Sequence, residues 1–493
     1  MNTPVRRVAI AVMAMILLLL ANLTYVQVVK AGDYRTDPRN KRVLLAEYSR
    51  KRGQISAGNQ VVASSTETTD RLRYQRGYPD GPVYAPITGF YSVNHGSSGI
   101  ERSAEDILNG SDDRLFGRRL SDLITGRDPS GGNIVLTIDP DIQQVAYDQL
   151  NSKHYDGAVV ALDPKTGAIL AMASTPSYDP GQLATHDATA ESNAYTALNK
   201  ANPPVLINRA ISQTYPPGST FKLIDTAAAL ASGRFTVDSP LTAAPTITLT
   251  NTNTTLENYN GNACGTGATA TLKDALQRSC NTAFAQMAGE LGEQAIRDQA
   301  QAFGIGTQDL TIPQTVAPST IGDIPDTAAL QQSAIGQRDV ALTPLQNAMI
   351  VAAIANGGQL MAPYLIKEIQ SQELTPVSTT EPDRLGQAVD SGIARTLTDL
   401  MVNNENSYGG AGKISGVQIA AKTGTAEHGV DSKGTAPHVW YVAFAPAYDP
   451  KIAVAVLVED GGDPNDLAAT GGAIAAPIGR AVIAKGLQKA GAR

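Results

Sequence analysis

A single run of apolar residues near the N-terminus constrains this chain more than any other feature. Residues 8–20 are an almost unbroken series of Val, Ala, Ile, Met and Leu, and residues 21–29 extend it with a few polar side chains. About 20 residues of helix cross a bilayer, so residues 8–29 are predicted to form a transmembrane anchor. Arg6 and Arg7 precede this run, which predicts that residues 1–7 are cytoplasmic and that everything after the anchor is extracytoplasmic.

The competing interpretation of this run is a cleaved signal peptide, with Val29 and Ala31 at the cleavage site. Those small residues lie well beyond Leu20, where the dense apolar segment ends, so an uncleaved anchor is favoured. The sequence contains no second run of this kind. We therefore expect a single-pass protein of the plasma membrane, with its bulk outside the cytoplasm.

Composition excludes several classes of function. The 493 residues suggest two to four domains, and the net charge of −7 leaves no basic stripe for nucleic acid. The five histidines show no metal-ligand spacing with one another or with the two cysteines. We therefore expect no metal and no cofactor.

The order of apolar patterns after the anchor predicts two parts, residues 30–130 and residues 131–493. The first part shows short strand-like pieces such as Gln60–Ser64 between turn signals. In the second part, apolar strands occur early and late, and helical patterns lie between them. This predicts an α+β domain in which an antiparallel sheet is flanked by helices and carries an inserted helical subdomain. The expected strands are 133–138, 157–162, 168–173, 417–422, 439–444 and 452–458, and the expected helices are 140–150, 272–291, 344–355 and 472–487.

The most informative stretch of the second part is Pro216-Pro217-Gly218-Ser219-Thr220-Phe221-Lys222. Two prolines and a glycine make a turn, so a helix is predicted to open at or just after Ser219. Residues three apart share a helix face, which would direct Ser219 and Lys222 the same way. A serine becomes a good nucleophile when a neutral lysine takes its proton. A capped helix start with a solvated lysine is the plainer interpretation, and one Ser-x-x-Lys quartet alone does not decide between them.

Two further short stretches carry chemistry of the same kind. Ser279-Cys280-Asn281 offers a hydroxyl that can pass a proton and an amide that can bind an amide, although such a triplet is commonly helix capping. Lys422-Thr423-Gly424-Thr425 lies on a late strand, where alternation puts Lys422 and Gly424 on one face. Gly424 would let a ligand or another backbone approach the strand. Each stretch alone is weak evidence.

Ser-x-x-Lys, Ser-x-Asn and Lys-Thr-Gly in this order resemble the signature of penicillin-recognising active-site-serine enzymes. From about Gly131 onward the chain is similar to the transpeptidase domain of class B penicillin-binding proteins, and the anchor with the residue 30–130 module resembles that class's arrangement. The module would then be non-catalytic, as a dimerisation or pedestal element. The segments that carry the likeness, besides the three motifs, are Lys51–Ile55, Gly96–Glu101, Leu136–Asp139 with Gln143, Asp163–Gly167, Asn208–Ala210, Gly336–Gln337 and Phe444–Pro446.

The resemblance implies a peptidoglycan D,D-transpeptidase that acts in wall growth or cell division. Ser219 would attack the D-Ala-D-Ala end of a stem peptide, and Lys222 would accept its proton. Ser279 and Lys422 would relay a proton to the departing D-alanine. Beta-lactams would remain attached to Ser219.

The resemblance also implies how the substrate is held. Asn281 would bind the peptide's amide, and the hydroxyls of Thr423 and Thr425 would bind its carboxylate beside Gly424. The backbone N–H groups of Ser219 and Thr425 would form the oxyanion hole. About 100 residues separate the anchor from this domain, too few for a fused glycan polymerase, so a membrane polymerase and other wall-synthesis proteins are expected partners.

Cys264 and Cys280 are the only cysteines, and both lie in the part expected outside the cytoplasm. Disulfides persist in such oxidising compartments, which predicts a bridge between them. The alternative is two unpaired buried thiols.

Four other functions stay open at this level. A D,D-carboxypeptidase or a serine beta-lactamase would share the fold, but hydrolysis usually needs a positioned glutamate, and Glu290 and Glu293 have no distinctive setting. A beta-lactam sensor would need a cytoplasmic signalling part, which seven residues do not supply. A scaffold with a vestigial centre is disfavoured because Ser219, Lys222 and Lys422 are intact.

Overall fold

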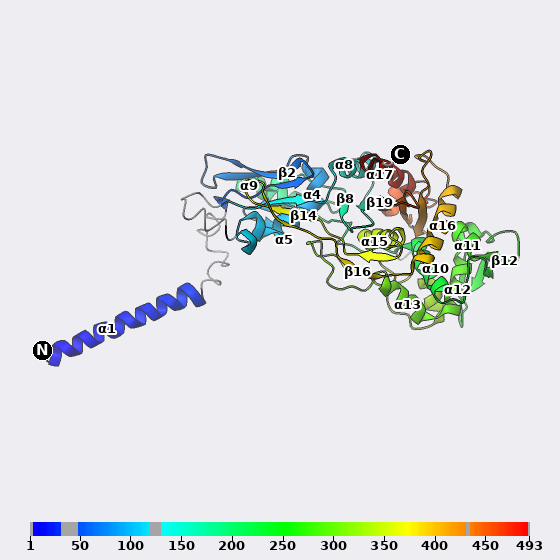
Figure 1. Ribbon diagram of the computed structural model, residues 1–493, viewed down its shortest axis with the longest axis horizontal. Coiled ribbons are helices and arrows are strands. Elements are labelled where there is room, and N and C mark those ends of the chain that lie inside the picture. Colours follow the sequence, from blue (N-terminus) through cyan, green and yellow to red (C-terminus); the bar gives the residue numbers. More distant parts are fainter. Residues whose placement is uncertain (1–2, 31–47, 116, 118–129, 430–433, 492–493) are drawn as a thin grey trace.

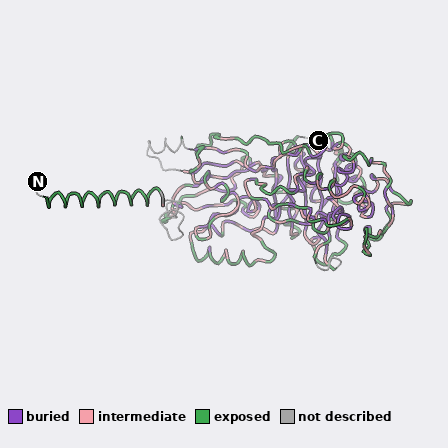
Figure 2. Tube along the Cα trace, turned by 90° about the horizontal axis from the view of Figure 1, so that it is seen from below, coloured by how far each residue is buried: buried purple, intermediate pink, exposed green. Residues whose placement is uncertain are grey.

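The computed structural model of the chain describes residues 3–30, 48–115, 117, 130–429 and 434–491. Helix α1 (Thr3–Thr24) continues into a π-helical turn (Tyr25–Val29), and none of the α1 residues is buried. Figures 1 and 2 show α1 standing away from the rest of the molecule, with exposed residues along its whole length. The apolar stretch Thr3–Val28 is long enough to cross a membrane and overlaps the predicted anchor, residues 8–29.

A five-stranded antiparallel sheet forms the centre of the larger part, in the order β17-β18-β19-β7-β8. Two neighbouring strands come from the early part of the chain and three from the late part, so the predicted arrangement around an inserted helical block is confirmed. The strands are β7 (Gly157–Leu162), β8 (Ile169–Thr175), β17 (Ala420–Ala426), β18 (His438–Ala445) and β19 (Ile452–Val458).

Helices cover both faces of this sheet, so the sequences of its central strands are continuous runs of apolar residues. Every residue of β18 and β19 is buried. Helices α8 (Pro140–Asn151) and α17 (Ala475–Lys489) pack on one face, and α15 (Pro344–Ala355) packs on the other. Asp139 caps α8, because its carboxylate accepts hydrogen bonds from the N–H groups of Asp141 and Ile142.

The inserted block packs against α16 (Ser391–Ser407), at the end of the molecule opposite α1 (Figure 1). The prediction of one helix over residues 272–291 is wrong, because Ser279 adopts a left-handed conformation with φ of 58° and ends the first helix. The elements of the block are β9 (Pro240–Thr242), β10 (Thr246–Thr248), β11 (Thr255–Glu257), β12 (Thr269–Thr271), α10 (Lys222–Ala231), α11 (Leu272–Arg278), α12 (Asn281–Leu291), α13 (Glu293–Ala302) and α14 (Thr327–Ser333).

Helices α9 and α16 are among those that were not predicted. Helix α9 (Ala188–Asn199) lies in an Asn- and Ala-rich stretch that the apolar pattern describes as irregular. Most of its residues are at least partly exposed, so it has no apolar stripe to reveal it. Its signal is instead the N-cap, since the Asp187 carboxylate accepts from the N–H groups of Thr189 and Ala190.

A second sheet, in the order β15-β14-β6-β1-β2-β3, takes three strands from each of the two predicted parts. Its strands are β1 (Ile55–Ala57), β2 (Gln60–Glu67), β3 (Tyr74–Gly77), β6 (Asn133–Leu136), β14 (Ile366–Gln370) and β15 (Pro376–Thr379). The hairpin β14–β15 comes from the larger part, so the two parts share this sheet. The predicted boundary at residues 130 and 131 adjoins residues 118–129, which lie outside the described residues, and it stays a prediction. The other described elements are α4 (Gly81–Thr88), α5 (Gly99–Ser103), α6 (Glu105–Leu108), β4 (Tyr91–Ser92), β5 (Gly96–Ser97), β13 (Gln359–Met361) and β16 (Arg384–Gln387).

A buried ion cluster joins the two N-terminal segments that resemble class B motifs. The Arg52 guanidinium lies 2.5 Å from one oxygen of Glu101, and the Arg76 guanidinium lies 2.6 Å from the other. The hydroxyl of Tyr78 also donates to Glu101, at 3.2 Å. All four side chains are buried, and a buried carboxylate needs such partners to stay ionised. This cluster fixes α5 against β3 and the start of β1.

Candidate active site

Ser219 lies in a 3₁₀ turn (Gly218–Thr220) that leads directly into α10. The helix is therefore where the Pro-Pro-Gly sequence predicts it, with one tighter turn before it. Gly218 has φ of +52° and donates its N–H to the carbonyl of Gly336 at 2.9 Å. A Cβ atom on Gly218 would lie 2.6 Å from the carbonyl oxygen of Thr425. A glycine is required here because the serine turn packs directly onto β17.

Lys222 is fully buried and lies beside the predicted nucleophile. Its Nζ is 3.1 Å from Ser219 Oγ, as the spacing of three residues predicts. The same nitrogen is 2.8 Å from both the carbonyl oxygen of Ser279 and Oδ1 of Asn281, and 3.4 Å from Ser279 Oγ. The first two motifs therefore meet at one amine.

Lys422 approaches this centre from the sheet. Its Nζ lies 2.9 Å from Ser279 Oγ and 2.9 Å from the carbonyl oxygen of Thr423. Ser279 Oγ thus stands between the two lysines and within hydrogen-bond distance of each. Its left-handed backbone, rare for a residue with a side chain, places the hydroxyl there. The structure brings together Ser219, Lys222, Ser279, Asn281 and Lys422, five of the eight predicted site residues, through direct contacts.

Burial and mutual repulsion favour neutral amines in this cluster. Burial, assisted by the charge of Lys422, holds the pKa of Lys222 well below its usual value. Burial alone lowers the pKa of Lys422 to about 7. Two ammonium groups this close disfavour each other, so the cluster favours the state in which Lys222 is neutral and Lys422 carries the proton. Lys222 can therefore accept a proton from Ser219, and Lys422 can donate one through Ser279.

Asp225 is a site neighbour that the sequence reasoning missed. It follows Lys222 by three residues on α10, is fully buried, and has neither carboxylate oxygen hydrogen-bonded. Burial raises the pKa of this carboxyl well above its ordinary value, which favours its uncharged form. The spacing of three from Lys222 was the available signal.

The remaining three predicted residues line β17 beside the serine turn. Lys422 and Gly424 are buried while Thr423 and Thr425 are partly exposed, which is the alternation that a strand predicts. The N–H of Thr423 donates to the hydroxyl of the partly buried Tyr408, at 3.3 Å. Across the sheet Gly424 pairs with Trp440, whose indole N–H donates to the carbonyl of Pro216 at 3.0 Å. Both residues were missed from the sequence: Trp440 ties the sheet to the serine turn, and Tyr408 ties β17 to the end of α16.

We expect Gly424→Ala to slow acylation at Ser219 by about 100-fold. A Cβ atom at Gly424 would lie 2.8 Å from the carbonyl oxygen of Pro217 and 3.0 Å from Cβ of Trp440, so the strand and the serine turn must separate. Misplacement of reacting groups by about 1 Å costs on the order of 100-fold in rate. Stopped-flow acylation by a chromogenic beta-lactam measures this, and Gly386→Ala, where nothing lies within 4 Å of the added Cβ atom, is the control. A rate within about twofold of the unmodified protein would contradict the packing argument.

The structure contains the predicted Cys264–Cys280 disulfide, with the two Cα atoms 5.8 Å apart and a sequence separation of 16 residues. Both cysteines are buried in the core of the helical block. Cys280 lies between Ser279 and Asn281, so the bridge ties the second motif to the loop that follows β11.

Removal of the bridge, as in the double variant Cys264→Ala with Cys280→Ala, is expected to lower the free energy of unfolding of the unit that contains it by about 3 kcal/mol. The reason is that closing a loop of this length restricts the unfolded chain. Urea unfolding followed by fluorescence, with and without reducing agent, measures the effect. Reduction should destabilise the unmodified protein and leave the double variant unchanged; equal behaviour of the two proteins would contradict the prediction.

The fold and these three converging motifs define a penicillin-recognising, active-site-serine protein. Residues 157–484 match the family described as penicillin binding protein transpeptidase domain, and residues 52–134 match the penicillin binding protein A dimerisation domain. The chain belongs to the transpeptidase family of penicillin-binding proteins, as the motif order predicted.

Relatives of known name extend the likeness over the whole chain. It is 56% identical over 492 residues to the peptidoglycan D,D-transpeptidase PbpA of Mycolicibacterium smegmatis, an alignment that covers 99% of this chain and 100% of the relative. It is 55% identical over 493 residues to PbpA of Mycobacterium tuberculosis, covering 99% of both. A solved structure of penicillin-binding protein A from M. tuberculosis, a ceftriaxone acyl-enzyme complex, superposes with a TM-score of 0.88 at 54% identity and covers 90% of this chain and all of the other. The chain is thus a class B penicillin-binding protein similar to the actinobacterial A type.

Proposed function

We propose that this chain is a peptidoglycan D,D-transpeptidase that cross-links stem peptides through an acyl-enzyme on Ser219 and that beta-lactams inhibit it by acylating the same oxygen. The observation that carries the proposal is the approach of Lys222 Nζ to Ser219 Oγ, at 3.1 Å, inside a buried cluster that favours the neutral amine. Two relatives above 50% identity over nearly the whole chain bear the name peptidoglycan D,D-transpeptidase. Solved relatives above 50% identity are described as acyl-enzyme complexes with ceftriaxone, imipenem and penicillin G.

The first half of the reaction forms the ester. Ser219 Oγ attacks the carbonyl carbon between the two D-alanines, and its proton passes to Lys222. The backbone N–H groups of Ser219 and Thr425 stabilise the oxyanion, a contribution of about 3–4 kcal/mol for each donor. The C–N bond then breaks, and the departing D-alanine amine takes a proton from Lys422 by way of Ser279.

The second half transfers the acyl group. An amine of a second stem peptide attacks the ester carbonyl and gives up a proton to the lysine–serine cluster. The new amide bond forms, the ester bond to Ser219 Oγ breaks, and Ser219 regains its proton. Asn281 binds the donor peptide's amide, and Thr423 and Thr425 bind its terminal carboxylate. Asn281 is positioned for this because its Oδ1 faces Lys222 while its Nδ2 donates to the carbonyl of Glu257 at 3.0 Å.

Hydrolysis is the competing outcome within the same fold. The two glutamates weighed for that role have other partners, since Glu290 accepts from Gln286 and Glu293 pairs with Arg297. Incubation of the protein with a peptidoglycan-like substrate, followed by mass analysis of the products, tests the proposal. Cross-linked dimer is the expected product, and trimmed monomer alone would assign a carboxypeptidase instead.

The anchor and the N-terminal module complete the proposal. The apolar helix α1 spans the plasma membrane with residues 1–7 inside, and the catalytic part acts outside on the wall. Residues 30–130 form a non-catalytic dimerisation or pedestal module and residues 131–493 the transpeptidase. A membrane glycan polymerase, together with other wall-synthesis proteins, supplies the strands that are cross-linked.

A further inference from the structure

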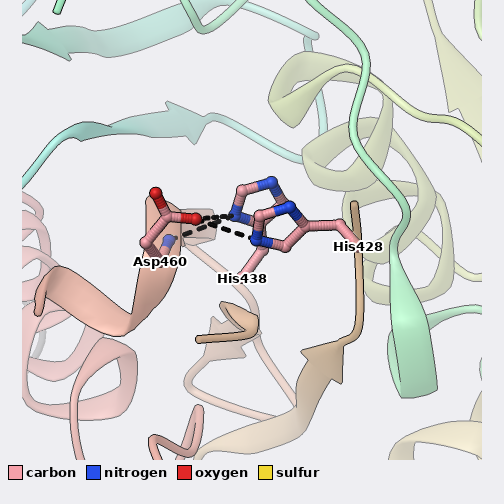
Figure 3. A group of neighbouring side chains, drawn as sticks. All are labelled: His428, His438 and Asp460. Carbon is pink, nitrogen blue, oxygen red and sulfur yellow. Dashed lines mark hydrogen bonds and ion pairs between the residues drawn. The ribbon is translucent and has the colours of Figure 1, made fainter. Parts of the chain in front are cut away.

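Three potential metal ligands meet just beyond the Lys-Thr-Gly strand. His428 follows the end of β17, His438 is the first residue of β18, and Asp460 lies in the 3₁₀ turn Glu459–Gly462 after β19. One ligand atom from each residue lies within 4.8 Å of the others. Figure 3 shows the two imidazole rings side by side, with the carboxylate directed at both.

Among these three residues, hydrogen-bond acceptor atoms outnumber the protons available to them. Nε2 of His428 lies 2.8 Å from Oδ1 of Asp460 and 2.9 Å from the carbonyl oxygen of Ala436, so one nitrogen faces two oxygens. Nδ1 of His438 lies 3.6 Å from the same carboxylate oxygen and accepts the backbone N–H of Asp460 at 3.1 Å, so this nitrogen carries no proton. Oδ1 of Asp460 is enclosed, and although it lies close to His428 it has no well-formed hydrogen bond. A cation would satisfy these atoms together.

The backbone of the turn is held in an uncommon conformation to place this carboxylate. Asp460 has φ of +47° and ψ of 35°, in the left-handed region that residues with a side chain rarely adopt. Such strain is frequent where a ligand is held. His438 is buried and packs edge-on against Tyr215, so its ring is fixed from the other side.

We propose that His428, His438 and Asp460 bind a single divalent transition-metal ion, with zinc as the expected occupant. Two imidazole nitrogens and one carboxylate oxygen are a common donor set for this ion, and the Ala436 carbonyl or a water molecule would complete four-coordination. The rings are stacked, with centroids 3.7 Å apart. A bound metal lies near the plane of each ligand ring, so binding requires the His428 ring to turn out of the stack. Its side chain is 22% exposed, which gives it room to do so.

The proposed metal ion would have a structural role and would take no part in the chemical reaction. An ion there would tie the segment that follows Thr425 to the turn after β19, and so brace the end of the substrate-binding strand. Sequence spacing did not reveal the group because its members are 10 and 22 residues apart and come from three different elements. The inference does not depend on the proposed transpeptidase activity.

Cobalt titration of the full-length protein in detergent, without a polyhistidine tag and after treatment with a chelator, tests the proposal. The unmodified protein should take up one equivalent of Co²⁺ with the visible absorption of a four-coordinate site, and Zn²⁺ should displace it. His428→Ala and Asp460→Asn should each weaken binding at least tenfold. His186→Ala is the matched control, because His186 pairs with Asp70 at 2.5 Å in a His–Asp pair outside the three-ligand group.

Two results would overturn the proposal. One is an unmodified protein that gives no such absorption with Co²⁺, and the other is wild-type affinity in both His428→Ala and Asp460→Asn. Thermal unfolding in the presence of chelator shows whether each variant is folded before it is titrated. Added Zn²⁺ should raise the unfolding temperature of the unmodified protein and of His186→Ala, and should leave that of His428→Ala unchanged.

Discussion

Ser219→Ala is expected to abolish covalent labelling by a fluorescent penicillin, with a loss of at least about 10⁴-fold in the acylation rate constant. The reason is that Ser219 Oγ lies 3.1 Å from Lys222 Nζ, in the turn that packs onto β17. Without it no ester can form, whatever the remaining groups do. Gel fluorescence and the intact mass of the protein after incubation measure the loss.

The control for this experiment is Ser232→Ala, at the opposite end of the same helix. Ser232 Oγ donates to the carbonyl of Ala229 at 2.7 Å, so its removal perturbs α10 without touching the cluster. This variant should label at the normal rate. Persistent label on Ser219→Ala, mapped to Ser279 by peptide mass, would assign the nucleophile to the second motif instead. Both variants should show thermal unfolding close to that of the unmodified protein.

Many strands and helices could be predicted from the sequence because the burial of apolar residues determines where they form. The predicted strand 452–458 is observed residue for residue, since a strand buried on both faces is a continuous apolar run between turns. The apolar helix α1 and the buried helix α15 were predictable in the same way, from the length of their apolar runs. Helix α9 was not predicted because it is largely exposed. The break at Ser279 was not predicted because a residue in the left-handed conformation does not alter the apolar periodicity of the sequence around it.

The site, too, could be predicted only in part from the sequence. Its named residues came from the resemblance, and only the Ser219–Lys222 contact followed from spacing along one helix. That Ser279 Oγ stands between Lys222 and Lys422 depends on three segments, since Ser279 is 57 residues from Lys222 and 143 residues from Lys422 along the chain, and no local pattern encodes such a convergence. Supporting residues such as Tyr408 and Trp440 were missed for the same reason, since each acts on a segment remote in the chain.

Lys222→Met is expected to lower the acylation rate constant by about 10³-fold or more, because it removes the base that accepts the Ser219 proton. Methionine nearly fills the volume of the buried side chain, so the fold should persist, although Ser279 O and Asn281 Oδ1 each lose a donor. Stopped-flow acylation measures the rate. Lys273→Met, on the exposed side of α11, is the control for loss of a lysine and should acylate normally.

The pH dependence separates a base from a merely structural lysine. Since burial holds the pKa of Lys222 well below its usual value, burial favours the neutral amine, and the amine gains a proton as the pH falls. Acylation of the unmodified protein should therefore decline on the acidic side as Lys222 is protonated, and the residual reaction of Lys222→Met should lack that decline. If the variant acylated within tenfold of the unmodified protein, or kept the same acidic limb, proton acceptance would belong to another group, and Lys422 acting through Ser279 would be the candidate.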